Sequence, residues 1–308
     1  MIWRARLSLG IAALAPAFMA GAGAAEASIH AHGSVGQVYV TGLHPRTQTS
    51  LINRARRTVA RKRADALGGL LFRNVRPGTG YRVRVFHGGR SPRLTVLSAR
   101  SAPPSTRVYN QAIPSKGYGY LTTRDGTKLA FYVHPPQDVT NALPGVQPPQ
   151  VPAGPGPTLI EYSGYGYADP AGPQSGIAIL ANLMGFTVVD VNMRGTGCSG
   201  GAFDFFEPLQ SLDGYDVVET VARQPWVKYH KVGMMGISYG GISQLFTGQT
   251  RPPSLAAISP LSVIDQTQTT LYPGGILNTG FAVAWAKERA HDAKPASPHG
   301  GQEWAYKR

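Results

Sequence analysis

The stretch Gly236-Ile237-Ser238-Tyr239-Gly240 decides how this chain is interpreted, because it reads Gly-x-Ser-x-Gly between a strand-like and a helix-like segment. An apolar run, 231–235, precedes it, and small and apolar residues compatible with a helix, 241–246, follow it. In such a turn the serine hydroxyl projects from the end of a strand, and the flanking glycines avoid clashes in a tight backbone. The pentapeptide alone is a loose pattern, and an ordinary strand end with a glycine-rich turn is the alternative.

Strands and helices alternate along the chain around this turn. Apolar runs typical of buried strands occur at 158–162, 186–191, 231–236 and 255–259. Apolar residues at helical spacing occur between them, at 175–183 and 212–222. This alternation predicts a parallel sheet with right-handed crossovers, and such sheets bind their ligands at the carboxyl ends of the strands. Ser238 is therefore expected at the edge where an α/β sheet places its site.

A predicted hairpin precedes these elements. Arg124-Asp125-Gly126-Thr127 separates two alternating runs, 118–123 and 128–133. Asp-Gly between such runs favours a tight turn in which both central residues have positive φ. The following residues, 135–157, are rich in Pro and Gly, and we expect an exposed loop without regular structure.

Residues 33–102 are predicted to form a small basic β domain. Short alternating segments occur at 37–40, 81–85 and 93–97. The segment 75–85 resembles the entry to the penultimate strand of a fibronectin type III or immunoglobulin-like sandwich, in which a tyrosine, here Tyr81, bonds back to the backbone. An irregular basic extension is the alternative. Pro103-Pro104-Ser105 marks the boundary after this domain.

The net charge of +14 is concentrated in the same region. Between Arg46 and Arg107 there are fifteen Lys or Arg residues and one acid, Asp65. Such a segment is able to bind a polyanion, either nucleic acid or an acidic polymer of the cell envelope. No aromatic residue interrupts the densest run, 54–63, so base stacking is not expected and nucleic acid is not a predicted partner. A solvated basic face is the simpler interpretation, with acidic envelope polymer as the open alternative.

The first 27 residues have the pattern of a cleaved signal peptide. Arg4 and Arg6 precede an apolar stretch, 7–19, and small residues follow, with 25–27 or 22–24 as the cleavage tripeptide. The apolar stretch is shorter than the roughly 20 residues of a spanning helix, so export is preferred to a retained anchor, and the protein is expected to be secreted or in the cell envelope. The single cysteine, Cys198, excludes a disulfide within the chain. We expect it to be a small buried residue rather than a catalytic thiol.

A serine at this turn needs help to act as a nucleophile. Its hydroxyl requires a base to remove the proton and hydrogen-bond donors to hold the developing oxyanion. The backbone N–H of Tyr239, the residue after the serine, is the expected first donor. The second donor must come from the loop after an earlier strand, which here is the segment 162–166.

The chain resembles the cocaine esterase and X-prolyl dipeptidyl peptidase (CocE/NonD) group of α/β-hydrolases. The resemblance covers residues 118–285 and rests on segments in the order of that group: 124–129, 192–201, 224–226, 233–241 and 272–275. It implies an α/β-hydrolase core over 115–280, with the start of a helical cap at 281–308. It also implies that Ser238 is the nucleophile and that the hydroxyl of Tyr165 is the second oxyanion donor, with Tyr162 as the fallback.

Gly195-Thr196-Gly197-Cys198-Ser199-Gly200 also fits the dinucleotide-binding pattern Gly-x-Gly-x-x-Gly. The residues after it, 202–208, do not open a helix, and no second mononucleotide-binding half follows. In the resemblance this loop instead frames the floor of the site, with Arg194 held by nearby carboxylates. The histidines are scattered without metal-ligand spacing, so neither a metal nor a cofactor is predicted.

The chain departs from the group at its C-terminal end. In this fold the acid and the histidine of the triad follow the serine, after two later strands. The resemblance implies that both lie beyond Arg308, and that the α/β-hydrolase sheet is incomplete at its C-terminus. The late candidates His291, Asp292 and His299 are expected to be polar residues of the cap. The two interpretations left are an incomplete copy of a longer hydrolase, inactive as it stands, and a chain that folds differently.

The sequence thus predicts an exported serine hydrolase that acts on small ester or X-Pro peptide substrates through a Ser238 acyl-enzyme. The alternative is a non-catalytic envelope-binding protein that uses its Arg-rich N-terminal domain. A parallel sheet that ends early leaves apolar surface uncovered, so we also expect this chain to be marginally stable or prone to aggregation.

Overall fold

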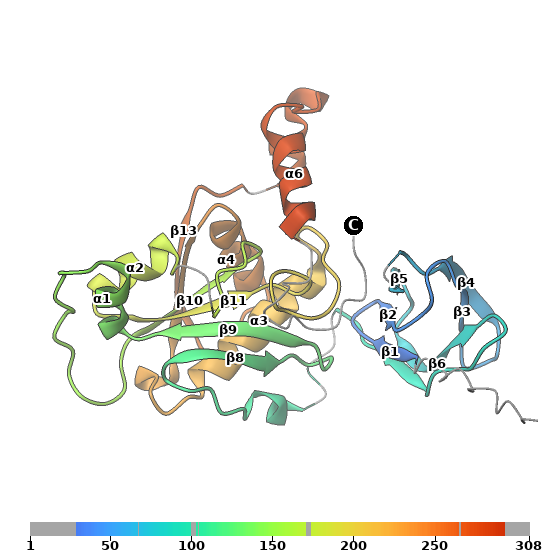
Figure 1. The fold of residues 1–308 in the computed structure, drawn as a ribbon, viewed down its shortest axis with the longest axis horizontal. Helices are drawn as coiled ribbons and strands as arrows, with labels where there is room; N and C mark the ends of the chain where they lie inside the picture. The colour runs from blue at the N-terminus through green and yellow to red at the C-terminus, as the bar shows by residue number, and fades with distance from the viewer. Residues whose placement is uncertain are drawn as a thin grey trace, which may run out of the picture.

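The computed structural model describes residues 29–292, apart from residues 67, 100–102, 104, 171–173 and 265. The predicted signal peptide and His299 lie outside these residues. The chain forms an N-terminal β part beside a larger α/β part (Figure 1). None of the helices in the described portion is long and apolar enough to cross a membrane.

The N-terminal part is a β-sandwich of seven short strands: β1 (His30–Gly33), β2 (Val38–Thr41), β3 (Gln48–Ile52), β4 (Thr58–Arg63), β5 (Leu70–Phe72), β6 (Gly78–Val85) and β7 (Leu94–Val96). One sheet has the order β1-β2-β5 and the other β4-β3-β6-β7, and all their pairs are antiparallel. Alternate residues such as Val40, Phe72 and Val83 form the core between the sheets. The hydroxyl of Tyr81 donates a 2.7 Å hydrogen bond to the Arg76 carbonyl, the bond expected of a sandwich tyrosine.

The sandwich packs on the α/β part through the outer face of its three-stranded sheet. Tyr39 and Leu71 contact Ala202 of the α/β part, and a second apolar cluster joins Val35 to Leu209. Polar contacts follow the same seam, with Arg73 and Asp204 3.2 Å apart, the Ser34 hydroxyl donating to Asp125, and Gln37 to Glu207. The other sheet of the sandwich is therefore turned away from the α/β part.

The α/β part is built on a six-stranded sheet: β8 (Gly117–Thr122), β9 (Lys128–His134), β10 (Thr158–Ser163), β11 (Thr187–Asn192), β12 (Val232–Ile237) and β13 (Leu255–Leu261). Its order is β13-β12-β10-β11-β9-β8. The four strands from β10 onward are parallel, whereas β8 and β9 form an antiparallel hairpin attached to β11. This mixed sheet is the expected α/β-hydrolase architecture.

Helices cover both faces of this sheet. They are α2 (Gly176–Leu183), α3 (Pro208–Ala222) and α4 (Tyr239–Gln249). Alternate residues of each strand point to opposite faces, so Val189 and Met234 pack with α3, whereas Val188 and Met235 pack with α2. The shorter helices are α1 (Val139–Ala142), α5 (Thr267–Leu271) and four 3₁₀ turns, η1 (Thr106–Tyr109), η2 (Pro136–Asp138), η3 (Lys228–His230) and η4 (Pro273–Gly275). The last described helix, α6 (Phe281–Asp292), stands at the top of Figure 1.

Two local predictions are wrong. Residues 135–157 contain η2 and α1, because Pro136 can open a helical turn, so this loop is not without regular structure. In the hairpin turn, Gly126 has a φ of 88° but Asp125 is not at positive φ. The Gly126 N–H donates to Thr123, and the Asp125 carboxylate accepts from the Thr127 N–H, so the loop is longer than the predicted two-residue turn.

Candidate active site

Ser238 lies at the sharp turn between β12 and α4. Its φ of 56° and ψ of −117° are a strained conformation for a residue with a side chain. The backbone holds this geometry from both sides, because the Ser238 N–H donates to the Leu261 carbonyl at 2.9 Å and its carbonyl accepts from Ile242 at 2.8 Å. The strain turns the hydroxyl out of the sheet, as expected for a nucleophilic serine.

The glycines around Ser238 are not equally necessary. A Cβ at Gly236 would lie 2.8 Å from the Gly240 carbonyl, so no side chain fits there. At Gly240, the second glycine of the motif, the nearest atom to such a Cβ is the Ser163 Cβ at 3.5 Å, which is an ordinary contact. A Cβ at Gly241 would lie 2.3 Å from the Leu261 carbonyl oxygen. The expectation that both motif glycines avoid clashes is therefore wrong at Gly240, and Gly241 has that role.

The structure brings Tyr165 and Tyr239, the two donors expected from the sequence, beside Ser238. The Tyr165 hydroxyl donates to the Ser238 Oγ at 3.0 Å, and the Tyr239 N–H points at the same phenol oxygen at 3.4 Å. The two tyrosine rings meet edge to face, with centroids 6.0 Å apart. A backbone N–H and a phenol O–H thus converge beside one serine oxygen, which is the donor pair that an oxyanion requires.

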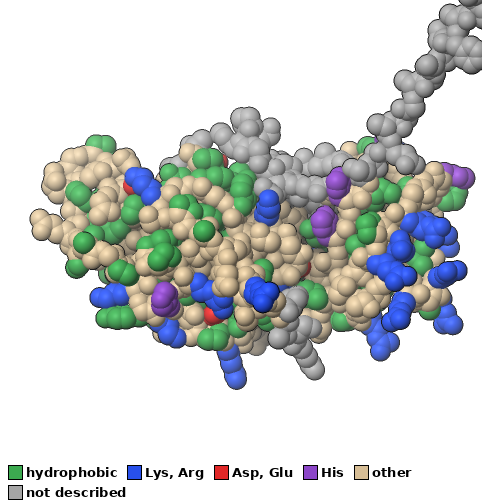
Figure 2. Space-filling view, turned by 90° about the horizontal axis from the view of Figure 1, so that it is seen from below, with side chains coloured by type: hydrophobic (Ala, Val, Ile, Leu, Met, Phe, Trp, Pro, Cys, Tyr) green, Lys and Arg blue, Asp and Glu red, His purple; other side chains and the backbone are tan. Residues whose placement is uncertain are grey.

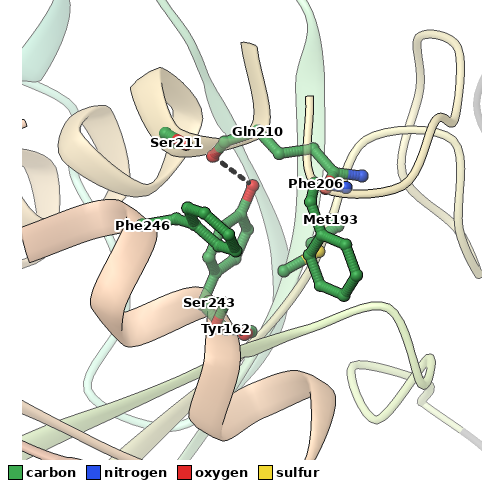
Figure 3. Close-up of a pocket in the computed structure, with 7 residues that line it drawn as sticks. All are labelled: Tyr162, Met193, Phe206, Gln210, Ser211, Ser243 and Phe246. Carbon is green, nitrogen blue, oxygen red and sulfur yellow. Dashed lines mark hydrogen bonds between the residues drawn. The ribbon is translucent and has the colours of Figure 1, made fainter. Parts of the chain in front are cut away.

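Tyr162, the fallback donor, points elsewhere. Its hydroxyl donates to the Gln210 carbonyl at 3.0 Å, beneath α3 (Figure 3). Burial raises the pKa of Tyr162 well above its ordinary value. The space that it lines with Met193, Phe206 and neighbouring residues is only about 10 Å³, too small for a substrate. Tyr162 therefore supports the packing below the site, and its hydroxyl is directed at Gln210 rather than at the serine.

One face of α6 closes the site with residues that the sequence interpretation missed. Trp285 lies 5.7 Å from the Tyr239 ring and 5.5 Å from Phe205, measured between ring centroids. The Arg289 guanidinium lies 4.6 Å from the centre of the Tyr165 ring, and only 5% of this residue is exposed. Phe281, Trp285 and Arg289 are spaced four residues apart, so they share one face of the helix, and that spacing was the available signal.

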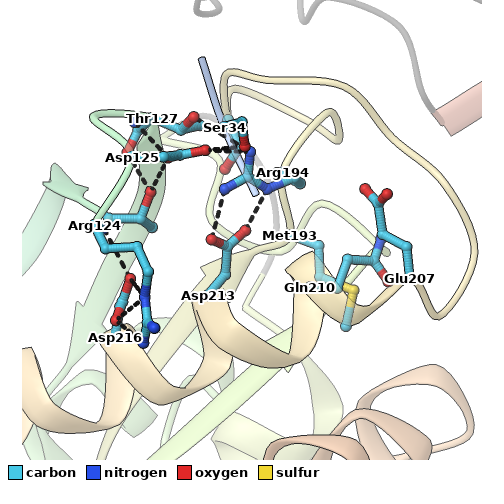
Figure 4. Close-up of polar contacts among 12 residues, drawn as sticks. Ser34, Arg124, Asp125, Thr127, Met193, Arg194, Glu207, Gln210, Asp213 and Asp216 are labelled. Atoms are coloured by element: carbon cyan, nitrogen blue, oxygen red, sulfur yellow. Dashed lines mark hydrogen bonds and ion pairs between the residues drawn. The ribbon is translucent and has the colours of Figure 1, made fainter. Parts of the chain in front are cut away.

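Arg194 is held by carboxylates as predicted, in a buried network that also includes the sandwich (Figure 4). Its guanidinium makes two 2.6 Å bonds to Asp213 and a 3.1 Å bond to Asp125, which accepts from Ser34. Burial alone would raise the pKa of Asp125, but the Arg194 guanidinium outweighs it and holds that pKa well below its usual range. The dinucleotide-like loop after Arg194 forms turns rather than a helix, and Cys198 is buried.

A second set of buried titratable groups lies within the sheet. Burial, with the Asp190 carboxylate nearby, raises the pKa of Glu161 to about 8. Glu161 accepts a hydrogen bond from the Ser175 hydroxyl, and His134 Nε2 lies 3.3 Å from Asp190. Because Glu161 keeps its proton at neutral pH, the pair of carboxyls Glu161 and Asp190 carries less negative charge than two ionised carboxylates would.

No histidine side chain that the structure describes is hydrogen-bonded to Ser238. His134 pairs with Asp190, and His230 contacts the Ala222 carbonyl. His291 and Asp292 end α6, but their side chains lie outside the described residues. Among the described residues there is likewise no cluster of three potential metal ligands.

Comparison with known proteins places this site in a family. None of the curated proteins compared with the chain matches it. Among solved structures, the chain is similar to a CocE/NonD family hydrolase from Staphylococcus aureus, with a TM-score of 0.48 and 22% identity over 59% of this chain and 33% of that one. It is also similar to an aminopeptidase from a marine sediment Thaumarchaeota archaeon, with a TM-score of 0.37 and 19% identity over 54% of this chain and 27% of that one. A third similar structure is an α-amino acid ester hydrolase, with a TM-score of 0.36 and 18% identity over 53% of this chain and 29% of that one.

The chain thus spans about a third of the length of the first of these structures. The model of the X-Pro dipeptidyl-peptidase (S15) family matches residues 125–308, which include the serine turn, both tyrosines and α6. On this match the chain belongs to the X-Pro dipeptidyl-peptidase (S15) family.

Proposed function

We propose that Ser238 is the nucleophile of an acyl-transfer hydrolase that acts on a small ester or on an X-Pro peptide. The observation that carries the proposal is the strained Ser238 with the Tyr165 hydroxyl 3.0 Å from its Oγ and the Tyr239 N–H beside it. Family membership supports the same chemistry. The proposal includes both substrate classes, small esters and X-Pro peptides.

In the proposed reaction, the Ser238 Oγ attacks the substrate carbonyl carbon and passes its proton to a base. The carbonyl oxygen becomes an oxyanion and receives hydrogen bonds from the Tyr165 hydroxyl and the Tyr239 N–H. The tetrahedral intermediate then expels the alcohol or amine, which takes the proton from the base, and leaves an acyl-enzyme. Water repeats the sequence and frees the acid.

The resting geometry suggests how the oxyanion donors are released for substrate. The Tyr165 hydroxyl now donates to the Ser238 Oγ, and the Tyr239 N–H is directed at the phenol oxygen at a long 3.4 Å. A carbonyl oxygen that enters between them would accept both donors and replace two contacts internal to the protein. None of the described histidine side chains is hydrogen-bonded to Ser238, and the proposal assigns this base to no residue.

The test is covalent labelling of the full chain with a fluorophosphonate, followed by intact-mass and peptide analysis. We expect one adduct, on Ser238, that is absent in Ser238→Ala and unchanged in Ser211→Ala, a matched serine on α3. An adduct on another serine, or equal labelling of both variants, would contradict the proposal. Parallel assays with p-nitrophenyl acetate and Gly-Pro-p-nitroanilide then separate an esterase from an X-Pro peptidase.

A further inference from the structure

The four-stranded sheet of the sandwich turns its outer face to solvent, and that face is strongly basic. The three-stranded sheet packs on the α/β part, so the two faces of this domain have different surroundings. On β6, Tyr81 and Val83 point into the core, whereas Arg82 and Arg84 alternate with them and point outward. Figure 2 shows Lys and Arg side chains gathered over this domain, at the right of the view.

Six arginines from separate segments meet around one hollow of about 860 Å³, which we call the arginine groove. They come from the β3–β4 turn, from β6, and from the segment between β6 and β7: Arg54, Arg56, Arg82, Arg84, Arg90 and Arg93. The remaining lining residues are polar, small or aliphatic, namely Ile52, Asn53, Thr79, Gly80, Leu94 and Thr95. The groove thus presents positive charge from strands that are far apart in the sequence.

These charges have no acidic partner within the described residues. From Arg46 to Arg107 the sequence has one acid, Asp65, whose carboxylate accepts from the Gly69 N–H. Arg73 of this domain pairs with Asp204 at the seam with the α/β part, away from the groove. Arg82 donates to the Ser91 carbonyl at 2.9 Å, which orients its guanidinium but does not neutralise it. Six like charges around one hollow repel one another, and an anionic ligand would relieve that repulsion.

We propose that the arginine groove binds an acidic polysaccharide, a chain that carries carboxylate or sulfate groups. The planar guanidinium forms paired hydrogen bonds with carboxylates and with oxyanions of similar shape. The volume of the groove lies in the range of sites that hold small organic ligands, enough for a few sugar units of such a chain. Its site is separate from Ser238, and the proposal does not depend on catalysis.

The composition of the groove argues against nucleic acid as the occupant. Proteins that bind single strands stack the bases on aromatic side chains, and no aromatic residue lines the groove. Readers of duplex DNA insert a helix or a β-ribbon into a groove of the duplex, whereas here the basic residues lie around a hollow in a sheet face. Nucleic acid is therefore the competing outcome of the test.

The experiment measures binding of the full chain to fluorescein-labelled polygalacturonate and heparin by fluorescence anisotropy, between 50 and 300 mM salt, roughly the range over which such contacts weaken steeply. We expect binding that weakens steeply with salt. Arg84→Gln/Arg93→Gln changes two exposed arginines that line the groove and should weaken binding about tenfold. Arg107→Gln/Arg251→Gln removes the same charge from exposed positions on the α/β side of the boundary and should weaken it less than twofold.

Equal effects of the two double variants would overturn the groove as the site, because net charge alone would then explain binding. Tighter binding to a DNA duplex or single strand of equal length and charge would overturn the polysaccharide assignment. The groove variant should keep the wild-type melting temperature, because both side chains are exposed. A binding loss that comes with a lowered melting temperature counts against the proposal unless Arg84→Lys/Arg93→Lys restores binding.

Discussion

Replacing Gly241 by alanine should distort the turn that holds Ser238. The new Cβ would lie 2.3 Å from the Leu261 carbonyl oxygen and 3.1 Å from the Leu261 nitrogen. Both atoms are backbone, so the clash cannot be relieved by a rotamer change, and α4 and β13 must move apart. The same Leu261 oxygen accepts the Ser238 N–H at 2.9 Å, so this movement also weakens the bond that anchors the serine.

The magnitude follows from these two effects. Overpacking of this kind costs about 1–3 kcal/mol, and loss of one hydrogen bond adds about 0.5–1.5 kcal/mol. The higher helix propensity of alanine returns up to about 1 kcal/mol. We therefore expect the free energy of unfolding to fall by about 2–3 kcal/mol, which lowers the melting temperature of a chain of this size by roughly 4–12 °C.

The matched control is Gly248→Ala in the same helix. No atom lies within 4 Å of a Cβ built at Gly248, so this change gains helix propensity without a clash and should raise stability by up to about 1 kcal/mol. The measurement is urea denaturation of both variants, followed by circular dichroism. If Gly241→Ala is as stable as Gly248→Ala, the close approach of α4 to Leu261 is wrong.

Three further outcomes are expected. Arg194→Met leaves Asp125 and Asp213 buried without their guanidinium, so the free energy of unfolding at pH 7, measured by urea denaturation, should fall by about 3–5 kcal/mol. This difference from wild type should shrink as the pH falls toward 4, because protonation of the two carboxylates removes the buried charge. A difference that does not depend on pH would contradict this. Because Glu161 has a pKa of about 8 when folded, above its ordinary value, the unfolded chain loses this proton first as pH rises. Wild-type stability should therefore fall between about pH 5 and pH 8 more steeply than that of Glu161→Gln, and parallel pH profiles would count against the raised pKa. If Ser238 labels, Tyr165→Phe should lower the labelling rate about 10²-fold with the fold intact, since one of two oxyanion donors is lost, and labelling within twofold of wild type would remove that role.

The parallel strands β10, β11 and β12 were predictable because most of their residues are buried and they read as apolar runs, and β13, although largely exposed, begins with an apolar run of the same kind. Ser238, Tyr165 and Tyr239 could be named as candidates from the sequence because the turn at Ser238 and the loop after β10 are local features, and the structure brings the three residues together. The strand β4 was missed, because nearly all of its residues are exposed and its arginines show no alternation. It forms through pairing with β3, which only the folded sandwich provides.

The contacts that α6 makes with the tyrosines beside Ser238 could not be predicted from the sequence, for a different reason. Trp285 and Arg289 reach the tyrosines through the docking of α6, and a helical repeat does not say which surface its face will meet. The role of Gly241 depends on how closely α4 approaches β13, which again is a property of packing. The Gly-x-Ser-x-Gly motif identified the right turn, but Gly241, the residue after the motif, is one of the positions where no side chain fits.

The seam between the sandwich and the α/β part limits how far this protein can be treated as two modules. Asp125 belongs to the hairpin turn of the α/β part, yet it accepts from Ser34 of the sandwich and from Arg194 at once. Arg73 likewise reaches across to Asp204. An α/β part cut free at the Pro-rich boundary would expose apolar side chains such as Leu209, and three of its acids, Asp125, Asp204 and Glu207, would each lose a partner in the sandwich. Although residue 103 marks a boundary in the sequence, the polar contacts across the seam mean that each part is stabilised by the other.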